Sequence, residues 1–157
     1  MDNKYVLVIG AANIDLGGTP YKPLIPNDSN PGVIKMNYGG VARNIAHNLA
    51  MLGAEVELVT AAGDDILGLE MLKKCEMTGI DTSLSVIVPG GSSSVYLFIN
   101  DEKGEMELAL SHVDIVNHIT PEYISPAAAT RTWTSSWKTT ATARSFWRRW
   151  GSGGGKF

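Results

Sequence analysis

The sequence has little of what several protein classes require. Its 157 residues include a single cysteine, Cys75, which excludes a disulfide framework and a cysteine-rich zinc site. It contains no run of about 18 apolar residues and no signal-peptide pattern at its start, so no membrane anchor is predicted. The formal net charge of −3 argues against general nucleic-acid binding. From these absences we expect a cytoplasmic protein that contacts neither membranes nor nucleic acids.

Acidic residues are absent from the last part of the chain. Residues 125–157 contain 6 of the 13 Lys and Arg residues, all 4 Trp residues and no Asp or Glu. Their charge is +6, whereas residues 1–124 carry 7 − 16 = −9. Basic residues interleaved with tryptophan can bind single-stranded nucleic acid through charge and stacking. Because no helical or strand period persists there, we favour a domain boundary at residue 124 and a tail foreign to the preceding domain.

Residues 1–124 alternate strand and helix patterns, which is typical of an α/β fold. Apolar runs at 5–9 and 55–60 predict buried strands, and the segment 41–52 between them has helical spacing. A strand, a helix and a strand in this order indicate a parallel sheet. A second helix is expected over 64–79. Its predicted inward side chains are Ile66, Leu69, Leu72 and Cys75.

Glycine and proline mark the loops and turns of this domain. The segment 17–32 is rich in Gly, Pro, Asn and Asp, and we expect a loop or short hairpin there. Three strand-like runs separated by turns span 83–110 and predict a small antiparallel flap. Such a flap either covers a site or pairs with a second copy. In its middle run, apolar Val95, Leu97 and Ile99 alternate with Ser94, Tyr96 and Phe98.

Asp15 is the first candidate site residue. It follows the first predicted strand, and ligands of open α/β sheets bind beyond the carboxyl ends of the strands. A carboxylate at that position can accept hydrogen bonds from a pair of sugar hydroxyls, although it can equally cap a turn. No G-x-G-x-x-G follows the strand, so a dinucleotide fingerprint is missing.

Gly39 and Gly40, directly before the first helix, form the second candidate. Two glycines let the backbone approach a ligand, with free N–H groups at the helix start. Asn44 lies one turn into the helix and offers both a donor and an acceptor. With Asp15 these residues would recognise a polyol, although two glycines are also compatible with a plain loop. His47 is interpreted as a surface helix residue.

Gly63, Asp64 and Asp65 form the third candidate. Acidic residues at a helix start are stabilised by the helix dipole, which is a sufficient reason for their presence. Cys75 is interpreted as a core residue rather than a nucleophile. No cluster has convincing metal-ligand spacing, and no Ser, His and Asp set can be assigned to hydrolysis. We therefore assign no catalytic residue, metal ligand or cofactor-binding residue.

Taken in order, these segments resemble the PfkB (ribokinase-like) carbohydrate kinases over about residues 4–124. The resemblance implies an incomplete ribokinase-like, Rossmann-like parallel sheet with helices and a small antiparallel β flap. It also implies transfer of the γ-phosphoryl group of ATP, with Mg²⁺, to the ribose 5′-hydroxyl of pseudouridine. The matching stretches are 12–15, 28–32, 39–46, 63–65, 104–106 and 119–123. The residues implied to contact the substrate are Asp15, Gly39, Gly40, Asn44, Ser94 and Tyr96, and more weakly Asp114.

The Gly-Ala-Gly-Asp motif of this family does not occur in the sequence. In the family its backbone N–H groups form an anion hole and its Asp deprotonates the acceptor hydroxyl. The ATP-binding segments have no counterpart either. We therefore predict a truncated, inactive form that keeps the substrate-binding residues, with a tail produced by a frame change. The alternative is a non-enzymatic nucleoside-binding module, or one that forms a homodimer through the flap.

Overall fold

The computed structural model describes residues 5–124. Contacts divide the chain into two units, Met1–His118 and Ile119–Phe157, and the elements below belong to the first. The predicted tail at 125–157 lies outside the described residues. Within the described part, no helix is long and apolar enough to span a bilayer.

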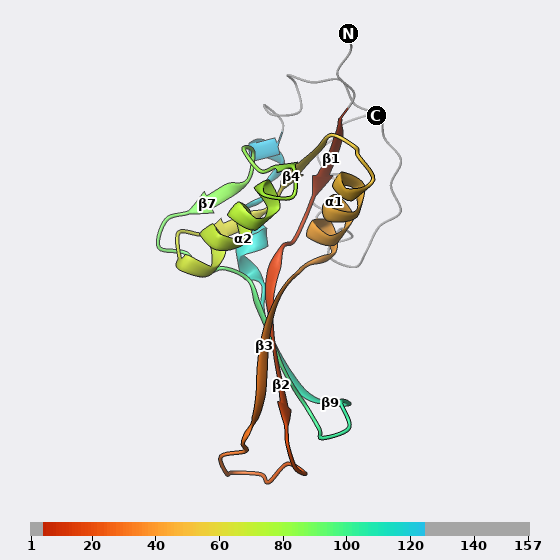
Figure 1. Cartoon of the computed structure of the whole chain (residues 1–157). Helices are drawn as coiled ribbons and strands as arrows, with labels where there is room; N and C mark the ends of the chain where they lie inside the picture. The colour runs from red at the N-terminus through yellow and green to blue at the C-terminus, as the bar shows by residue number, and fades with distance from the viewer. Residues whose placement is uncertain (1–4, 125–157) are drawn as a thin grey trace. The chain divides into compact units, whose positions relative to one another are not determined.

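The chain alternates strands and helices (Figure 1). In order, the elements are β1 (Val6–Ile9), β2 (Asn13–Pro20), β3 (Gly32–Gly39), α1 (Val41–Met51), β4 (Val56–Val59), β5 (Ala61–Gly63), α2 (Ile66–Glu76), β6 (Ile80–Asp81), β7 (Val86–Val88), β8 (Val95–Asn100), β9 (Met106–His112) and a 3₁₀ helix, η1 (Asp114–His118).

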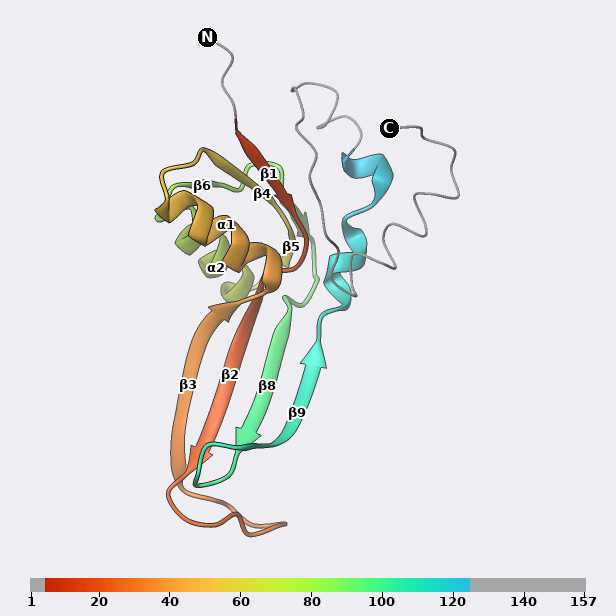
Figure 2. The same ribbon diagram turned by 90° about the vertical axis from the view of Figure 1, so that its right-hand side faces the viewer.

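A parallel three-stranded sheet in the order β1-β4-β6 and the helices α1 and α2 form what we call the head. This arrangement confirms the predicted α/β fold with a parallel sheet. Both helices lie on the same face of the sheet (Figure 2). The buried side chains between sheet and helices are Val8, Ala42, Ala46, Val56, Leu58, Cys75 and Ile80.

The inward stripe of α2 differs from the one predicted. Leu72 and Cys75 are buried as expected, but Ile66 and Leu69 are 82% and 46% exposed. The stripe instead begins at Gly68, where an added Cβ would lie 3.1 Å from the Ala62 Cβ. Sequence periodicity overlooked Gly68 because glycine carries no hydrophobic signal, yet its missing side chain lets the helix approach β5 closely.

A second sheet, which we call the flap, has the strand order β3-β2-β8-β9 (Figure 2). β2 pairs antiparallel with β3 and parallel with β8, and β8 pairs antiparallel with β9. The flap therefore includes residues 13–39 as well as 95–112, while β7 pairs with β5 in a separate sheet. The flap predicted from 83–110 alone was too small and began too early.

The loop or short hairpin expected at 17–32 is the turn of a hairpin, because β2 and β3 pair antiparallel on either side of residues 21–31. Its strands extend further than expected, since residues 17–20 complete β2 and residue 32 begins β3. Gly17, Gly18 and Pro20 have low intrinsic strand preference, so this part of the sequence indicated a loop. The backbone is nevertheless held as a strand by β3 on one side and β8 on the other.

Cross-strand register gives the flap two distinct faces, because residues opposite each other in neighbouring strands point to the same side. The predicted alternation in 93–100 is confirmed by this register. What we call the apolar face carries Ile14, Leu16, Gly18, Ile34, Met36, Tyr38, Val95, Leu97, Ile99, Leu108 and Leu110, together with His112. What we call the polar face carries Asn13, Asp15, Gly17, Thr19, Lys35, Asn37, Gly39, Tyr96, Phe98 and Ser111, together with Val33 and Ala109.

The apolar face of the flap packs against α2 of the head. Near the head, Ile14 of the apolar face packs in a cluster with Met71 and Leu72 of α2. Tyr38 packs against the same cluster, and burial together with the Glu70 carboxylate raises the pKa of its phenol. α2 covers the apolar face there, and three of the residues predicted to bind substrate, Asp15, Gly39 and Tyr96, lie on the opposite, polar face.

Candidate functional site

Asp15 lies on the polar face of β2, with Asn37 of β3 on one side and Tyr96 of β8 on the other. The Asn13 amide donates a hydrogen bond to Asp15 Oδ1, which fixes the orientation of the carboxylate. Burial raises the pKa of Asp15, while the hydrogen bond from Asn13 acts in the opposite direction. The result is a half-buried acceptor whose second oxygen, Oδ2, has no hydrogen bond from Asn13.

Gly39 brings the end of β3 against this carboxylate. A Cβ on Gly39 would overlap Asp15 Oδ2, so any other residue would displace the carboxylate. Gly40 follows with φ 94° and is the N-cap of α1, and a Cβ there would lie 2.6 Å from the Ala12 Cα. Both glycines are therefore required for α1 to begin beside Asp15.

Asn44 is one helical turn beyond Gly40, and its backbone N–H donates to the Gly40 carbonyl at 2.9 Å. Arg43 Nη1 donates to the Asn44 Oδ1 and to the Tyr38 carbonyl, both at 3.3 Å. This shared donor holds the Asn44 amide at the end of β3 and leaves its NH₂ group as a donor. The structure therefore brings Asp15, Gly39 and Gly40 together and places Asn44 at the same helix start.

Ser94 precedes β8 and is 1% exposed. Its carbonyl accepts the Ile14 N–H at 2.9 Å, which places it beside the Asn13 end of β2. Among residues 5–124, no partner bonds to the Ser94 Oγ. A buried hydroxyl without a partner is costly, so this group is suited to bind a polar ligand atom. Tyr96, two residues on, lies directly beside Asp15.

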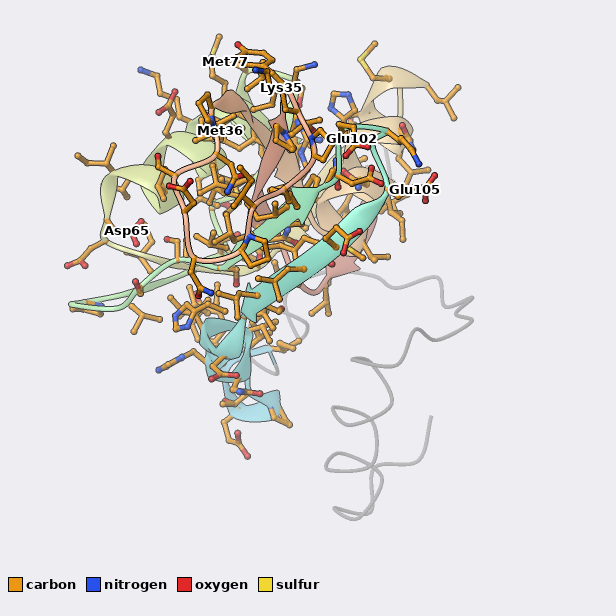
Figure 3. The ribbon with its side chains drawn as sticks, turned by 90° about the horizontal axis from the view of Figure 1, so that it is seen from below. Lys35, Met36, Asp65, Met77, Glu102 and Glu105 are labelled. Atoms are coloured by element: carbon orange, nitrogen blue, oxygen red, sulfur yellow. The ribbon has the colours of Figure 1, made fainter. Side chains whose placement is uncertain are left out.

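The third candidate, around Asp65, has a structural role. Asp65, labelled in Figure 3, is the N-cap of α2. It accepts hydrogen bonds from the N–H groups of Gly68 and Ser93, both at 2.7 Å. The Ser93 hydroxyl also donates to it at 2.7 Å. Burial alone would raise the pKa of Asp65, but these hydrogen bonds outweigh burial and lower it. Asp64 is exposed and accepts the Gly90 N–H at 2.9 Å.

Three other residues singled out from the sequence belong to elements other than the strand of Asp15: Cys75 to α2, His47 to α1 and Asp114 to η1. Cys75 is fully buried in the head, and burial raises the pKa of its thiol despite the opposing effect of nearby Arg43, so its interpretation as a core residue is confirmed. His47 lies on α1 and is half-buried rather than fully at the surface. Asp114 begins η1 and is exposed.

Sequence reasoning missed Asn13, Asn37 and Arg43. Asn13 stands two positions before Asp15, so strand alternation would have placed both on one face. Asn37 was missed because β3 was not recognised as the neighbour of β2. Arg43 carries no signal in the sequence, because its role depends on the Tyr38 carbonyl at the end of β3.

The Mg²⁺ ion that the resemblance implies has no fitting cluster of ligands among the described residues. Among residues 5–124, no group of three or more His, Cys, Asp or Glu side chains lies together as a metal site. The neighbouring carboxylates accept backbone N–H groups: Asp64 accepts that of Gly90, and Asp65 accepts those of Gly68 and Ser93.

Comparison with known proteins identifies the family. The model of the pfkB family carbohydrate kinases matches residues 3–129. Over 124 residues the chain is 44% identical to the pseudouridine kinase of Escherichia coli (strain K12), which covers 79% of this chain and 40% of that enzyme.

Solved structures agree with this match. The fold is similar to a carbohydrate kinase from Agrobacterium tumefaciens, with a TM-score of 0.69 and 28% identity over 77% of this chain and 39% of that one. It is also similar to a ribokinase from Cryptococcus neoformans var. grubii serotype A in complex with ADP, with a TM-score of 0.60 and 27% identity over 73% and 36% of the two chains. The chain thus spans about 40% of the length of these relatives. The predicted ribokinase-like fold is confirmed, and the chain belongs to the pfkB family of carbohydrate kinases.

Proposed function

We propose that this chain supplies the acceptor-binding part of a nucleoside kinase that phosphorylates the ribose 5′-hydroxyl of pseudouridine. The observation that carries the proposal is the Asp15 carboxylate, oriented by Asn13 and held against the Gly39 backbone. The 44% identity to the Escherichia coli pseudouridine kinase supports the choice of nucleoside.

Each residue of this arrangement has a distinct part in binding. Ionised Asp15 accepts hydrogen bonds from neighbouring ribose hydroxyls, and such charged bonds are stronger than neutral ones. The free NH₂ of Asn44 donates to a ribose oxygen, because Arg43 already occupies its carbonyl. The bare backbone at Gly39 and Gly40 lets the sugar approach closely. Together these contacts orient the acceptor, which is a large part of what phosphoryl transfer requires of a protein.

ATP, as Mg²⁺·ATP, supplies the transferred phosphoryl group in this family. No part of residues 5–124 is assigned to it, and the sequence contains no Gly-Ala-Gly-Asp. We therefore expect that the 157-residue chain by itself binds the nucleoside without phosphorylating it.

Two measurements on the purified chain test the proposal. Isothermal titration with pseudouridine should give a binding isotherm that Asp15→Asn weakens, while Asp28→Asn, an exposed loop substitution, leaves it unchanged. A phosphorylation assay with labelled ATP should give no product. Absence of binding would refute the proposed site, and sustained ATP-dependent product formation would refute the expected inactivity.

A second candidate function, a module that forms a homodimer through the flap, is favoured by the apolar face. Beyond the part covered by α2, Ile34, Leu108 and Leu110 are 80%, 60% and 63% exposed. Contiguous exposed apolar residues on a sheet are typical of an interface. A dimer in sedimentation equilibrium that Leu110→Lys dissociates, combined with no affinity for nucleosides, would favour this function over the first.

A further inference from the structure

Two residues beyond Asp15 on β2, the cross-strand neighbours on the polar face form a second row, and this row includes an aromatic side chain. Gly17, Phe98 and Lys35 lie opposite one another on β2, β8 and β3. A Cβ on Gly17 would overlap the end of the Phe98 ring, so the ring leans over the Gly17 backbone. Only a residue without a side chain permits this position.

Phe98 is accompanied by Tyr96, its neighbour on the same strand face. The two ring centroids are 5.9 Å apart with an interplanar angle of 36°. Both rings are half-buried, and each therefore keeps part of its surface available. Tyr96 also stands beside Asp15, so the aromatic pair runs from the Asp15 row to the Gly17 row.

Polar side chains border this aromatic pair on the β3 side. Asn37 lies opposite Asp15, and Lys35 lies opposite Gly17. Both are exposed, and among residues 5–124 neither has a recorded salt bridge or side-chain hydrogen bond. Figure 3 labels Lys35 and the adjacent Met36, which belongs to the apolar face. The polar face thus carries a cation and an amide on β3 and two rings on β8, with the Asp15 and Gly17 positions of β2 between them.

We propose that Phe98, Lys35 and Asn37 recognise the base of the nucleoside, and that Lys35 selects a base with a carbonyl group at the contacted edge. This inference rests on the proposed function, in which Asp15 binds the ribose. Neighbouring rows on one face of a strand are about 6.6–6.8 Å apart. That separation is comparable with the one between the ribose hydroxyls and the base of a nucleoside, so a nucleoside can span both rows.

The chemistry of the side chains sets the preference. An aromatic ring stacks on any base, and gains nothing from a free sugar. The Lys35 ammonium is a donor only, so it is matched by a carbonyl oxygen and opposed by an exocyclic amino group. Asn37 has a donor and an acceptor and fits an adjacent carbonyl and N–H, as found in uracil. The row therefore favours uracil-type nucleosides over free ribose, and over cytidine or adenosine.

Isothermal titration of the full chain with pseudouridine, ribose and cytidine tests this inference. We expect pseudouridine to bind about tenfold or more tightly than ribose, because stacking is added to the same sugar contacts. Phe98→Leu should reduce that ratio about tenfold without changing ribose affinity. Lys35→Met should reduce the preference for pseudouridine over cytidine about fivefold or more. The matched controls Tyr21→Leu and Lys103→Met alter exposed residues elsewhere and should change neither ratio.

The outcomes separate this inference from the proposed function. Equal affinity for ribose and pseudouridine, or an unchanged ratio in Phe98→Leu, would overturn the base-recognition proposal and leave sugar binding intact. Failure of all three ligands to bind a folded wild-type chain would overturn both. Thermal melting followed by circular dichroism establishes that each variant is folded, and Phe98→Tyr, which keeps a ring, should retain the wild-type ratio.

Discussion

The head and the flap are both built on β-strands, yet they use their side chains differently. All four residues of β4 in the head are buried, whereas six of the seven residues of β9 in the flap are exposed. In the head, strand side chains are covered by α1 and α2, and apolar packing stabilises the fold. In the flap, only the end nearest α2 is covered, and the polar face remains available. We therefore expect the stability of the fold to depend mainly on the head, whereas the proposed binding residues lie on the flap and at the start of α1.

The largest predicted effect tests this difference directly. Leu58→Ala removes a fully buried side chain from the head and should lower the free energy of unfolding by roughly 2–5 kcal/mol. Leu110→Ala makes the same chemical change in the flap, where the side chain is 63% exposed, and should cost about 0.5 kcal/mol or less. Urea unfolding of both variants measures the two values. Equal losses of unfolding free energy in the two variants would show that side chains of the head and of the flap contribute equally to stability.

Asp15→Asn should affect binding rather than stability. The loss of a charged acceptor should weaken pseudouridine binding by about 1.5–3 kcal/mol, which is roughly tenfold or more. Because burial raises the pKa of Asp15, the ionised form is disfavoured by folding, and removing the charge should not lower the free energy of unfolding at neutral pH.

The same substitution gives a pH test. As pH falls through the raised pKa of Asp15, the carboxylate gains a proton and loses its acceptor character. Wild-type affinity should therefore decrease as the pH falls through the raised pKa of Asp15 and approach that of Asp15→Asn, whose affinity stays constant. Titrations at several pH values check this. Parallel pH profiles for the two proteins would exclude Asp15 as the titrating acceptor.

Asp65→Asn should destabilise the head without affecting ligand contacts. Asn also caps helices, but its single acceptor oxygen cannot accept both the Gly68 and the Ser93 N–H groups, which bond to different oxygens of Asp65, so the loss of one bond should cost about 1–3 kcal/mol at neutral pH. The pKa of Asp65 is lowered in the folded state, so its stabilisation is complete above the ordinary carboxyl pKa of about 3.9 and is lost as pH falls through the folded pKa. The gap between wild type and variant in thermal melting should therefore narrow in acid. Glu102→Gln, an exposed turn substitution, should show no such gap.

Arg43→Met has the smallest predicted effect. It frees the Asn44 carbonyl and removes a donor from the Tyr38 carbonyl, two bonds of 3.3 Å. We expect pseudouridine affinity to fall by about two- to fivefold, because Asn44 remains present but is less well oriented. If Arg43 positions Asn44, the Asn44→Ala substitution should reduce pseudouridine affinity less in the Arg43→Met variant than in the wild-type chain. Additive losses would indicate that Arg43 does not position Asn44.

The sequence predicted elements well where hydrophobic periodicity and turn residues agree. The strands β1 and β4 and the helices α1 and α2 form where the patterns predicted them, and Gly53 directly follows the C-cap of α1 with φ 83°. The buried face of α1 is nevertheless made by Ala42 and Ala46, whereas Val41 and Ile45, whose spacing indicated the helix, are exposed. The alternation of Val95, Leu97 and Ile99 correctly indicated one apolar face. By contrast, Ile66 and Leu69 have the spacing of an inward stripe and are exposed, because the approach at Gly68 rotates that face away.

The sequence by itself determined the local structure and the chemical groups near the helix start: Asp15 after a strand, Gly39 and Gly40 before a helix, and Asn44 one turn later. These depend on neighbouring residues, whose backbone preferences are local. Only the tertiary structure decided that β2 is a full strand between β3 and β8, and that Asp15, Asn37 and Tyr96 form one row. The physical reason is that strand pairing joins distant segments, and its register depends on partners that no local pattern identifies.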